Sequence, residues 1–445
     1  MAILDYIVDL GAQVMMPIII IIFALILGAK PGKAIRAGLT VGVGFIGLNL
    51  VIGLLGDNLG TASQIMVERL GLNLTVIDVG WPAAAAIAFA SRVGALIIPL
   101  GLLVNIIMLI TNTTQTLNID IWNYWHFAFT GALVAAVTGS TAWGLVAAAL
   151  DMIIIMVIAD LTAPGVEKHL GLKGVSLPHG FTGAYVPIAI VINKILDMIP
   201  GVNKIDIDAE KLQNRLGVFG EPILIGTVIG LGIGIAAGYN LKQILNLGII
   251  MGAVLVLIPK MAAMLMEGLL PVSEAAQEFI QNKFKNRTRL YIGLDSAVGI
   301  GNPATLSVAL LLVPITVLLA AIIPGNKVIP FADLAVIPFS LVLVTPITKG
   351  NVFRNLIIGL LIVSCGLLIA TNLAPLHTQL AINANFKMPE GKAMISSICD
   401  GANPLAWLFT RVMEHKFIGA VIMTVISLGM AIFNGMRIRR QKAIN

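Results

Sequence analysis

The sequence is poor in charged residues and in cysteine. Only 11% of its 445 residues are charged, whereas about 25% is usual in soluble domains. The two cysteines, Cys365 in an apolar stretch and Cys399 in a polar one, lack the spacing of a metal site. The chain also has no Walker motif, no phosphate-binding glycine loop and no nucleophile elbow. These absences argue against a stand-alone ATP-driven transporter, and we expect no cofactor and no metal.

Apolar residues dominate the chain. They account for 58% of it, and the mean hydropathy is +0.98. Continuous runs such as 17–27 and 96–110 are typical of transmembrane helices and not of the short alternating segments of a β-barrel. The net charge of +6 comes from basic residues in predicted loops, where they orient a membrane protein and do not indicate nucleic acid. We therefore predict an all-α polytopic protein surrounded by membrane lipid.

Stretches of roughly 20 apolar residues, the length that crosses a membrane, occur throughout the chain. Two further segments, 77–91 and 292–306, are apolar but interrupted by polar residues, and we interpret them as re-entrant or unwound. Irregular backbone at membrane depth is tolerated only where protein or water surrounds it. The other stretches give about eleven predicted spans, namely 13–29, 38–55, 93–112, 126–139, 143–163, 221–238, 243–259, 307–324, 331–346, 352–371 and 416–434.

Several features recur in the same order along the chain. They lie about 210 residues apart, as an old duplication requires, and include the pairs Pro17 and Pro222, Pro99 and Pro314, and Pro164 and Pro375. Because five spans per half is an odd number, the halves should have opposite orientations. Most basic residues fall on one side when the N-terminus is outside and the C-terminus is cytoplasmic. We therefore expect two inverted five-helix repeats.

This duplication divides the chain into four parts. Residues 1–175 are predicted to form the first repeat and 220–375 the second. Residues 176–219 should contain an amphipathic helix on the cytoplasmic surface, around 183–200, followed by a solvated linker. Residues 376–445 should contain an outer connection, the last transmembrane helix and a basic cytoplasmic tail.

The interruption of the second broken segment is a candidate site. Asp295, followed by Ser296, either binds substrate hydroxyls, an ion or a proton, or caps the next helix. Asn302 and Thr305 flank Pro303 as at the start of a half-helix, whose free N–H groups would face a substrate. The alternative is a kink at Pro303 that Asn302 caps.

The first broken segment carries a matching set. Ser91 and Arg92 follow its small residues. Arg92 either contacts substrate or pairs with a buried carboxylate, with Asp295, Asp78 and Asp151 as candidates. Trp81 either stacks on the carbon face of a polyol or sugar, or anchors the chain at the membrane interface.

Outside these segments, a histidine and several turn residues are further candidates. His179 has a reference pKa of about 6.5 that suits proton handling or bonding to a hydroxyl, although a loop histidine can simply be solvated. Glu221 either starts the sixth span ahead of Pro222 or acts as a gate. For the remaining candidates we favour a role in tight turns over ligand binding: Thr138, Ser140, Thr348 and Asn351.

Six segments together carry a resemblance that none would support alone: Asp78-Val-Gly-Trp-Pro82, Pro178-His-Gly180, Phe219-Gly-Glu-Pro222, Ile292-Gly-Leu-Asp295, Gly350-Asn-Val-Phe-Arg354 and Leu376-His-Thr-Gln-Leu-Ala381. With them the chain resembles, over nearly its full length, the galactitol-type membrane component (IIC) of the bacterial sugar phosphotransferase system, in the ascorbate–galactitol superfamily.

The resemblance implies an inner-membrane homodimer with a fixed scaffold and a moving core that carries a polyol in elevator fashion. The substrate would be phosphorylated at the cytoplasmic face by a phosphocysteine of a separate IIB protein, which a IIA protein supplies. It also implies that Asp295 and His179 belong to the substrate site. The chain departs from the galactitol pattern at Arg92 and at Asn302-Pro303, which leaves another polyol or a pentitol open as the substrate.

Two other classes of function stay open. One is a secondary transporter driven by H⁺ or Na⁺, with Asp295 as the coupling site. The other is a substrate-sensing receptor that binds without turnover.

Overall fold

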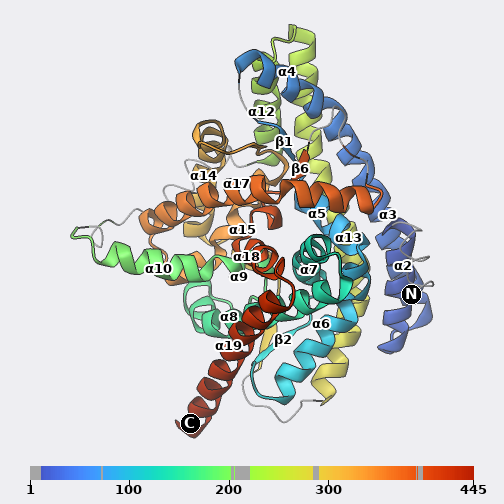
Figure 1. The fold of residues 1–445 in the computed structure, drawn as a ribbon, viewed down its shortest axis with the longest axis vertical. Helices are drawn as coiled ribbons and strands as arrows, with labels where there is room; N and C mark the ends of the chain where they lie inside the picture. Colours follow the sequence, from blue (N-terminus) through green and yellow to red (C-terminus); the bar gives the residue numbers. More distant parts are fainter. Residues whose placement is uncertain are drawn as a thin grey trace.

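A computed structural model describes residues 12–71, 74–201, 205, 221–283, 290–386, 388 and 394–444, and these are mainly helical (Figure 1). The predicted linker 201–219 lies almost entirely outside them, as do Phe219 and Gly220. The helices up to residue 200 are α2 (Ala12–Ile26), α3 (Pro31–Leu55), the π-turn η1 (Gly56–Gly60), α4 (Thr61–Leu70), α5 (Trp81–Ala90), α6 (Arg92–Ile110), the 3-10 turn η2 (Ile121–Asn123), α7 (Tyr124–Thr138), α8 (Thr141–Leu170), α9 (Gly180–Ala184) and α10 (Val186–Asp197).

The second half has a corresponding series. Its helices are α12 (Pro222–Ala236), α13 (Leu241–Lys283), η5 (Ser296–Gly299), α14 (Pro303–Ile322), η6 (Ala332–Val336), α15 (Ile337–Val342), α16 (Val344–Ile347), α17 (Val352–Asn383), η7 (Asp400–Ala402), α18 (Pro404–Met413) and α19 (Phe417–Ile444). Five described helices are long and apolar enough to cross a membrane: α6, α8, α14, α17 and α19. The chain is therefore a helical, multi-pass membrane protein.

All but one of the predicted spans coincide in position with a single helix. The exception is 331–346, which the structure divides into η6, α15 and α16. Proline cannot donate to a helix ladder, and Pro338 and Pro346 interrupt the segment. The predicted span 243–259 is instead the first part of α13, which continues to 43 residues.

Short β-strands mark the points where the helical chain is broken. β1 (Val76–Asp78) lies between β5 (Val328–Ile329) and β6 (Met394–Ser396), and β4 (Tyr291–Gly293) lies between β2 (Thr116–Asn118) and β3 (Val175–Ser176). All four pairings are parallel. The prediction of an all-α chain missed these strands, although it located both broken segments. Strand pairing supplies the hydrogen bonds that unwound backbone loses when it leaves a helix.

The break after β1 depends on one carboxylate and one glycine. Asp78 Oδ2 accepts hydrogen bonds from the main-chain N–H groups of Phe331 and Asp333, both at 2.9 Å. Gly80 then takes φ +88, and a Cβ there would lie 3.0 Å from Cβ of Ala332. A positive φ with a neighbouring side chain this close favours glycine. This turn directs Trp81 and Pro82 into the start of α5.

The helices pack in two groups. α13 packs along α3 and α12, and α3 also packs against α2, so the helices that precede the first strand of each half contact one another. The second group surrounds the strands, with α7, α8 and α19 packed together and α14 against α17. In Figure 1, α4 and α12 lie at one end of the molecule and α8 and α19 toward the other. The second group of helices therefore encloses the short sheets and the helix starts that follow their strands.

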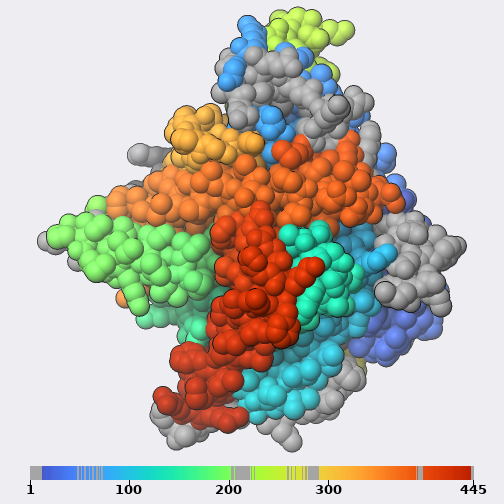
Figure 2. Space-filling view, viewed as in Figure 1, coloured from blue at the N-terminus to red at the C-terminus, as the bar shows by residue number. Residues whose placement is uncertain are grey.

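α10 is the amphipathic helix predicted around 183–200. Its apolar residues Ile190, Val191 and Ile195 are exposed, and Figure 2 shows the helix projecting from one edge of the molecule. It is attached to the start of α17 because Arg354 Nη1 donates to Asp197 Oδ1 at 2.6 Å and to Asn193 Oδ1 at 2.8 Å.

Candidate functional site

A cavity of about 260 Å³ lies between the two halves of the chain. This central cavity has walls from both halves, because strand ends and helix starts of each meet there. Its lining residues are Trp81, Asp120, Trp122, Trp125, His126, His179, Leu269, Leu270, Asp295, Ala297, Val336, Phe339 and Cys399. Ligand cavities are commonly about 300–1,000 Å³, so this one suits a small substrate.

Three tryptophans form one wall of the central cavity. The ring of Trp81 meets that of Trp122 edge-on at 6.0 Å between centroids and stacks with that of Trp125 at 6.4 Å. The main-chain N–H of Trp81 donates to Asp333 Oδ1 at 2.5 Å, which fixes the start of α5. Trp81 therefore lines the central cavity, and its stacking on a substrate stays a prediction.

Two carboxylates, those of Asp120 and Asp295, also line the central cavity. Asp295 caps η5 by accepting from the Ala297 N–H at 2.7 Å, and its own N–H donates to Asp120 Oδ2 at 3.1 Å. Both side chains line the cavity, so Asp295 is a helix cap and is also available to a ligand. Within the described ranges, no lysine or arginine lines the cavity. The cavity therefore provides several hydrogen-bonding groups, which suit neutral molecules with many hydroxyls.

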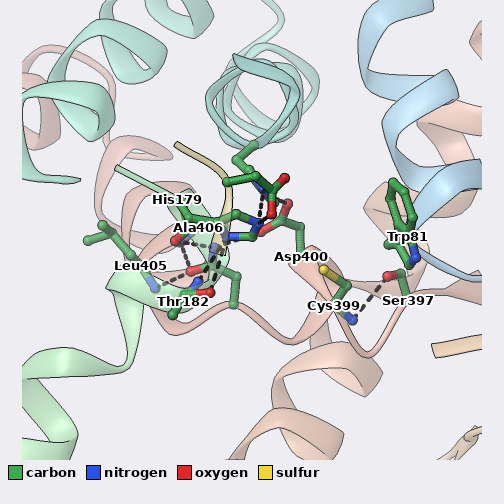
Figure 3. A network of polar contacts seen from close by, with 12 residues as sticks. Trp81, His179, Thr182, Ser397, Cys399, Asp400, Leu405 and Ala406 are labelled. Atoms are coloured by element: carbon green, nitrogen blue, oxygen red, sulfur yellow. Dashed lines mark hydrogen bonds and ion pairs between the residues drawn. The ribbon is translucent and has the colours of Figure 1, made fainter. Parts of the chain in front are cut away.

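Two histidines complete the polar side of the cavity. His179 begins α9, and its Nδ1 accepts from the Thr182 N–H at 3.3 Å. Its Nε2 lies 3.3 Å from Nε2 of His126 and 3.7 Å from Oδ1 of Asp295. On its other side, His126 Nδ1 bonds to Oδ2 of Asp400. Figure 3 shows this network, with His179 and Asp400 drawn close together.

Gly180 permits the contact between the histidines. A Cβ added to Gly180 would lie 2.4 Å from Cβ of His126, closer than real Cβ atoms approach. Any larger residue would therefore push α7 and the start of α9 apart. The segment Pro178-His-Gly180 thus needs its glycine to bring His179 against His126.

The remaining residues predicted near Asp295 have structural contacts. Asn302 caps α14, accepting from the N–H groups of Ala304 at 3.0 Å and Thr305 at 3.4 Å. The Thr305 hydroxyl bonds to that of Thr345 at 2.7 Å. The Ser296 hydroxyl is buried and has no hydrogen-bond partner among the described residues. None of the three lines the central cavity. α14 starts at Pro303, as the half-helix interpretation expects, and Asn302 caps this start.

Ser91 and Arg92 line a different cavity, of about 460 Å³, together with Ser140 and the end of α17. Ser91 caps α6 by accepting from the Gly94 N–H at 2.9 Å. Thr138 accepts from the Ser140 N–H at 3.3 Å in the tight turn between α7 and α8, where Gly139 has φ +70. The structure thus separates Ser91 and Arg92 from the central cavity, whereas Trp81 of the same predicted set lines it.

The two other predicted gate or turn residues begin helices. Asn351 caps α17, accepting from the Arg354 N–H at 2.9 Å. Glu221 is exposed and precedes Pro222 at the start of α12, but its side chain makes no capping hydrogen bond. Neither residue lines the central cavity.

Sequence reasoning missed much of the central cavity. Asp120, Trp122, Trp125 and His126 lie within nine residues, 118–126, directly ahead of the apolar run of α7. That density of polar and aromatic residues at the edge of a predicted span was the available signal. No sequence pattern indicates Asp400, because its contact with His126 joins residues 274 positions apart. No group of three or more metal-ligating side chains was found in the described residues.

Comparisons with known proteins agree with this architecture. A family profile described as EIIC-GAT, the PTS system sugar-specific permease component, matches residues 6–391. The chain is 42% identical over 429 residues to the "PTS system galactitol-specific EIIC component" of Escherichia coli (strain K12), covering 95% of this chain and 94% of that protein. The "Putative permease IIC component" of the same strain is also 42% identical, over 96% of this chain and 98% of the relative. The chain therefore belongs to the EIIC-GAT family of phosphotransferase-system permease components.

Proposed function

We propose that this IIC component carries galactitol or a closely related polyol in its central cavity. The observation that supports it most directly is that Asp120, Asp295, His179 and Trp81 line one cavity. Carboxylates and imidazoles bond to hydroxyl groups, and indole faces pack against the carbon chain. The galactitol-specific relative makes galactitol the first substrate to test.

We infer that the bound polyol is phosphorylated by a phosphocysteine of a separate IIB protein, which a IIA protein recharges. The chain has no nucleotide-binding motif of its own. The phosphoryl donor must then reach the cavity from the cytoplasm. This coupling distinguishes the proposal from a transporter driven by H⁺ or Na⁺.

We also propose that the two halves, 1–175 and 220–375, are inverted repeats. The sheets support this proposal, since β1 of the first half lies between β5 and β6, and β4 of the second half lies between β2 and β3. Of these strands, β6 (Met394–Ser396) follows residue 375, and β3 (Val175–Ser176) ends one residue past the first half. Helices α2, α3, α12 and α13 would form the scaffold of a homodimer, and the helices around the strands would form the moving core. An elevator movement of that core would carry the cavity across the membrane.

The proposed topology has about eleven spans, an outer N-terminus and a cytoplasmic C-terminus in the bacterial inner membrane. The exposed apolar residues of α10 would then lie in the cytoplasmic lipid surface. Single cysteines placed at Lys30 and Lys242 test this arrangement by labelling from either side of intact cells. The topology requires Lys30 to be cytoplasmic and Lys242 to be external, and labelling of both from one side would contradict it.

The function itself is tested in vesicles that hold the purified chain. Labelled galactitol is offered outside, with or without phosphorylated galactitol-specific IIB protein on the cytoplasmic side. Phosphorylated galactitol that forms only with IIB supports the proposal. Free galactitol that accumulates under an ion gradient without IIB would contradict it and favour a secondary transporter. Binding without uptake would favour a receptor.

A further inference from the structure

We propose that His126 is the general base for phosphoryl transfer. Asp400 orients the His126 ring and stabilises its protonated form. This inference rests on the proposed function, because it concerns the hydroxyl that accepts the phosphoryl group. It begins from a chain of hydrogen bonds whose direction can be assigned at every step. The chain runs from the Thr182 N–H through His179 and His126 to Asp400.

The direction of the chain is set at the Asp400 end. A carboxylate can only accept, so the neutral His126 ring carries its proton on Nδ1, which faces Asp400, and its Nε2 is unprotonated. In the contact between the two Nε2 atoms at 3.3 Å, His179 must then be the donor. Neutral His179 therefore carries its proton on Nε2, and its Nδ1 accepts from the Thr182 N–H.

Asp400 is held as an acceptor on both oxygens. Oδ2 accepts from His126, and Oδ1 accepts from Asn403 Nδ2 at 2.8 Å. Asn403 is itself fixed, because its Oδ1 caps α18 through the N–H of Leu405 at 2.9 Å. Asp400 does not line the central cavity, so it acts from behind His126. An aspartate behind a histidine whose Nε2 is unprotonated and faces the cavity is the arrangement of a general base.

A substrate hydroxyl can reach that lone pair. His126 and His179 both line the cavity, and His179 has a second acceptor in Asp295 Oδ1 at 3.7 Å. When His179 turns toward Asp295, a polyol hydroxyl takes its place and donates to His126 Nε2.

The reaction step then balances. The hydroxyl oxygen attacks phosphorus of the IIB phosphocysteine, the P–S bond breaks, and its electron pair leaves on sulfur as a thiolate. The hydroxyl proton moves to His126 Nε2, and the carboxylate of Asp400 stabilises the imidazolium that forms. The other buried, partnered histidine of the site, His179, is protonated on the nitrogen that faces the cavity and cannot serve as this base.

The test separates binding from transfer. Three of the five tryptophans line the cavity, so galactitol binding is followed by tryptophan fluorescence, and transfer by release of phosphate label from phospho-IIB. His126→Asn keeps an N–H toward Asp400 but has no base. We expect galactitol affinity within about threefold of the unaltered chain and transfer slower by about 10²–10⁴-fold. The control is His415→Asn, the same change at an exposed position, which should leave both unchanged.

A second variant tests the partnership. Asp400→Asn should slow transfer with little effect on affinity, and the double variant should be no slower than His126→Asn alone, because Asp400 acts only through His126. Additive losses in the double variant would show that Asp400 has a separate structural effect and would overturn its assigned role. Near-normal transfer by His126→Asn, or an equal loss of binding and transfer, would overturn the general base. If the unaltered chain binds galactitol but accepts no phosphate from IIB, the proposed function fails instead.

Discussion

The carboxylate of Asp333 accepts the main-chain N–H of Trp81 at 2.5 Å, across 252 residues of sequence. The same carboxylate accepts from the Ser397 hydroxyl at 2.5 Å and the Cys399 N–H at 3.1 Å. In the other half, Asp120 accepts the N–H of Asp295 at 3.1 Å. In each half, then, an aspartate near a second strand fixes the start of the broken segment in the opposite half.

Replacing this carboxylate should destabilise the protein. Asp333→Ala leaves the Trp81 N–H and the Ser397 hydroxyl without this acceptor, and each such loss costs about 1–3 kcal/mol. We expect a lower apparent melting temperature in detergent and weaker galactitol binding. Asp333→Asn, which keeps one acceptor, should be milder. Equal melting temperatures for Asp333→Ala and the unaltered chain would show that this contact does not stabilise the fold.

Variants of Asp295 and Asn302 should distinguish a ligand-binding residue from a helix cap. Asp295→Asn keeps an oxygen for the Ala297 N–H but removes the charge, so galactitol affinity should fall about 10–100-fold, the value of one charged hydrogen bond. Asn302→Ala should cost about 1 kcal/mol of stability through the lost cap without changing affinity. Affinity is measured by fluorescence titration and stability by thermal melting. If Asn302→Ala lowered affinity and Asp295→Asn lowered only stability, the assigned roles would be exchanged.

Gly180 should not tolerate a methyl group. In Gly180→Ala the new Cβ must move His126, so we expect a loss of about 1–3 kcal/mol from overpacking and a large fall in transfer rate. Gly301→Ala is the matched control, because a Cβ there meets nothing within 4 Å. Normal transfer by Gly180→Ala would mean that the approach of His126 and His179 is not needed.

The cavity should discriminate against its own product. Asp120 and Asp295 face the ligand, and no described lining residue is cationic. A phosphate ester carries about −1.5 to −2 charge near neutral pH, and opposing like charges cost several kcal/mol. Galactitol phosphate should therefore compete with galactitol roughly 100-fold more weakly in the fluorescence assay. Equal competition would require a cation that enters with the phosphate.

Much of the helical fold was predictable, because apolar runs of membrane length are long and unambiguous. Both broken segments were located from Asp78 and Asp295, which a lipid-facing helix would not carry. The three short helices that replace 331–346 were missed, since the apolar content of that segment hides the effect of Pro338 and Pro346. The strands were missed because two or three residues carry no periodicity.

The site was predictable only in part. Asp295, His179 and Trp81 were found because polar residues or proline stand out in an apolar segment. Asp120 and His126 are also polar residues beside an apolar segment, so the same reasoning could have found them. They were missed because they lie outside the predicted broken segments. Ser91 and Arg92 were placed with them by analogy between the halves, whereas the structure assigns them to another cavity. Asp400 depends on a contact that only the folded chain creates.

The exchange of strands between the halves has a consequence for synthesis. β1 is complete long before β5 and β6 leave the ribosome, and β2 and β3 must await β4. A nascent first half in the bilayer therefore holds unpaired strand edges, which are prone to wrong pairing. Insertion of the helices has to precede assembly of the cavity, and neither half expressed by itself can complete a sheet.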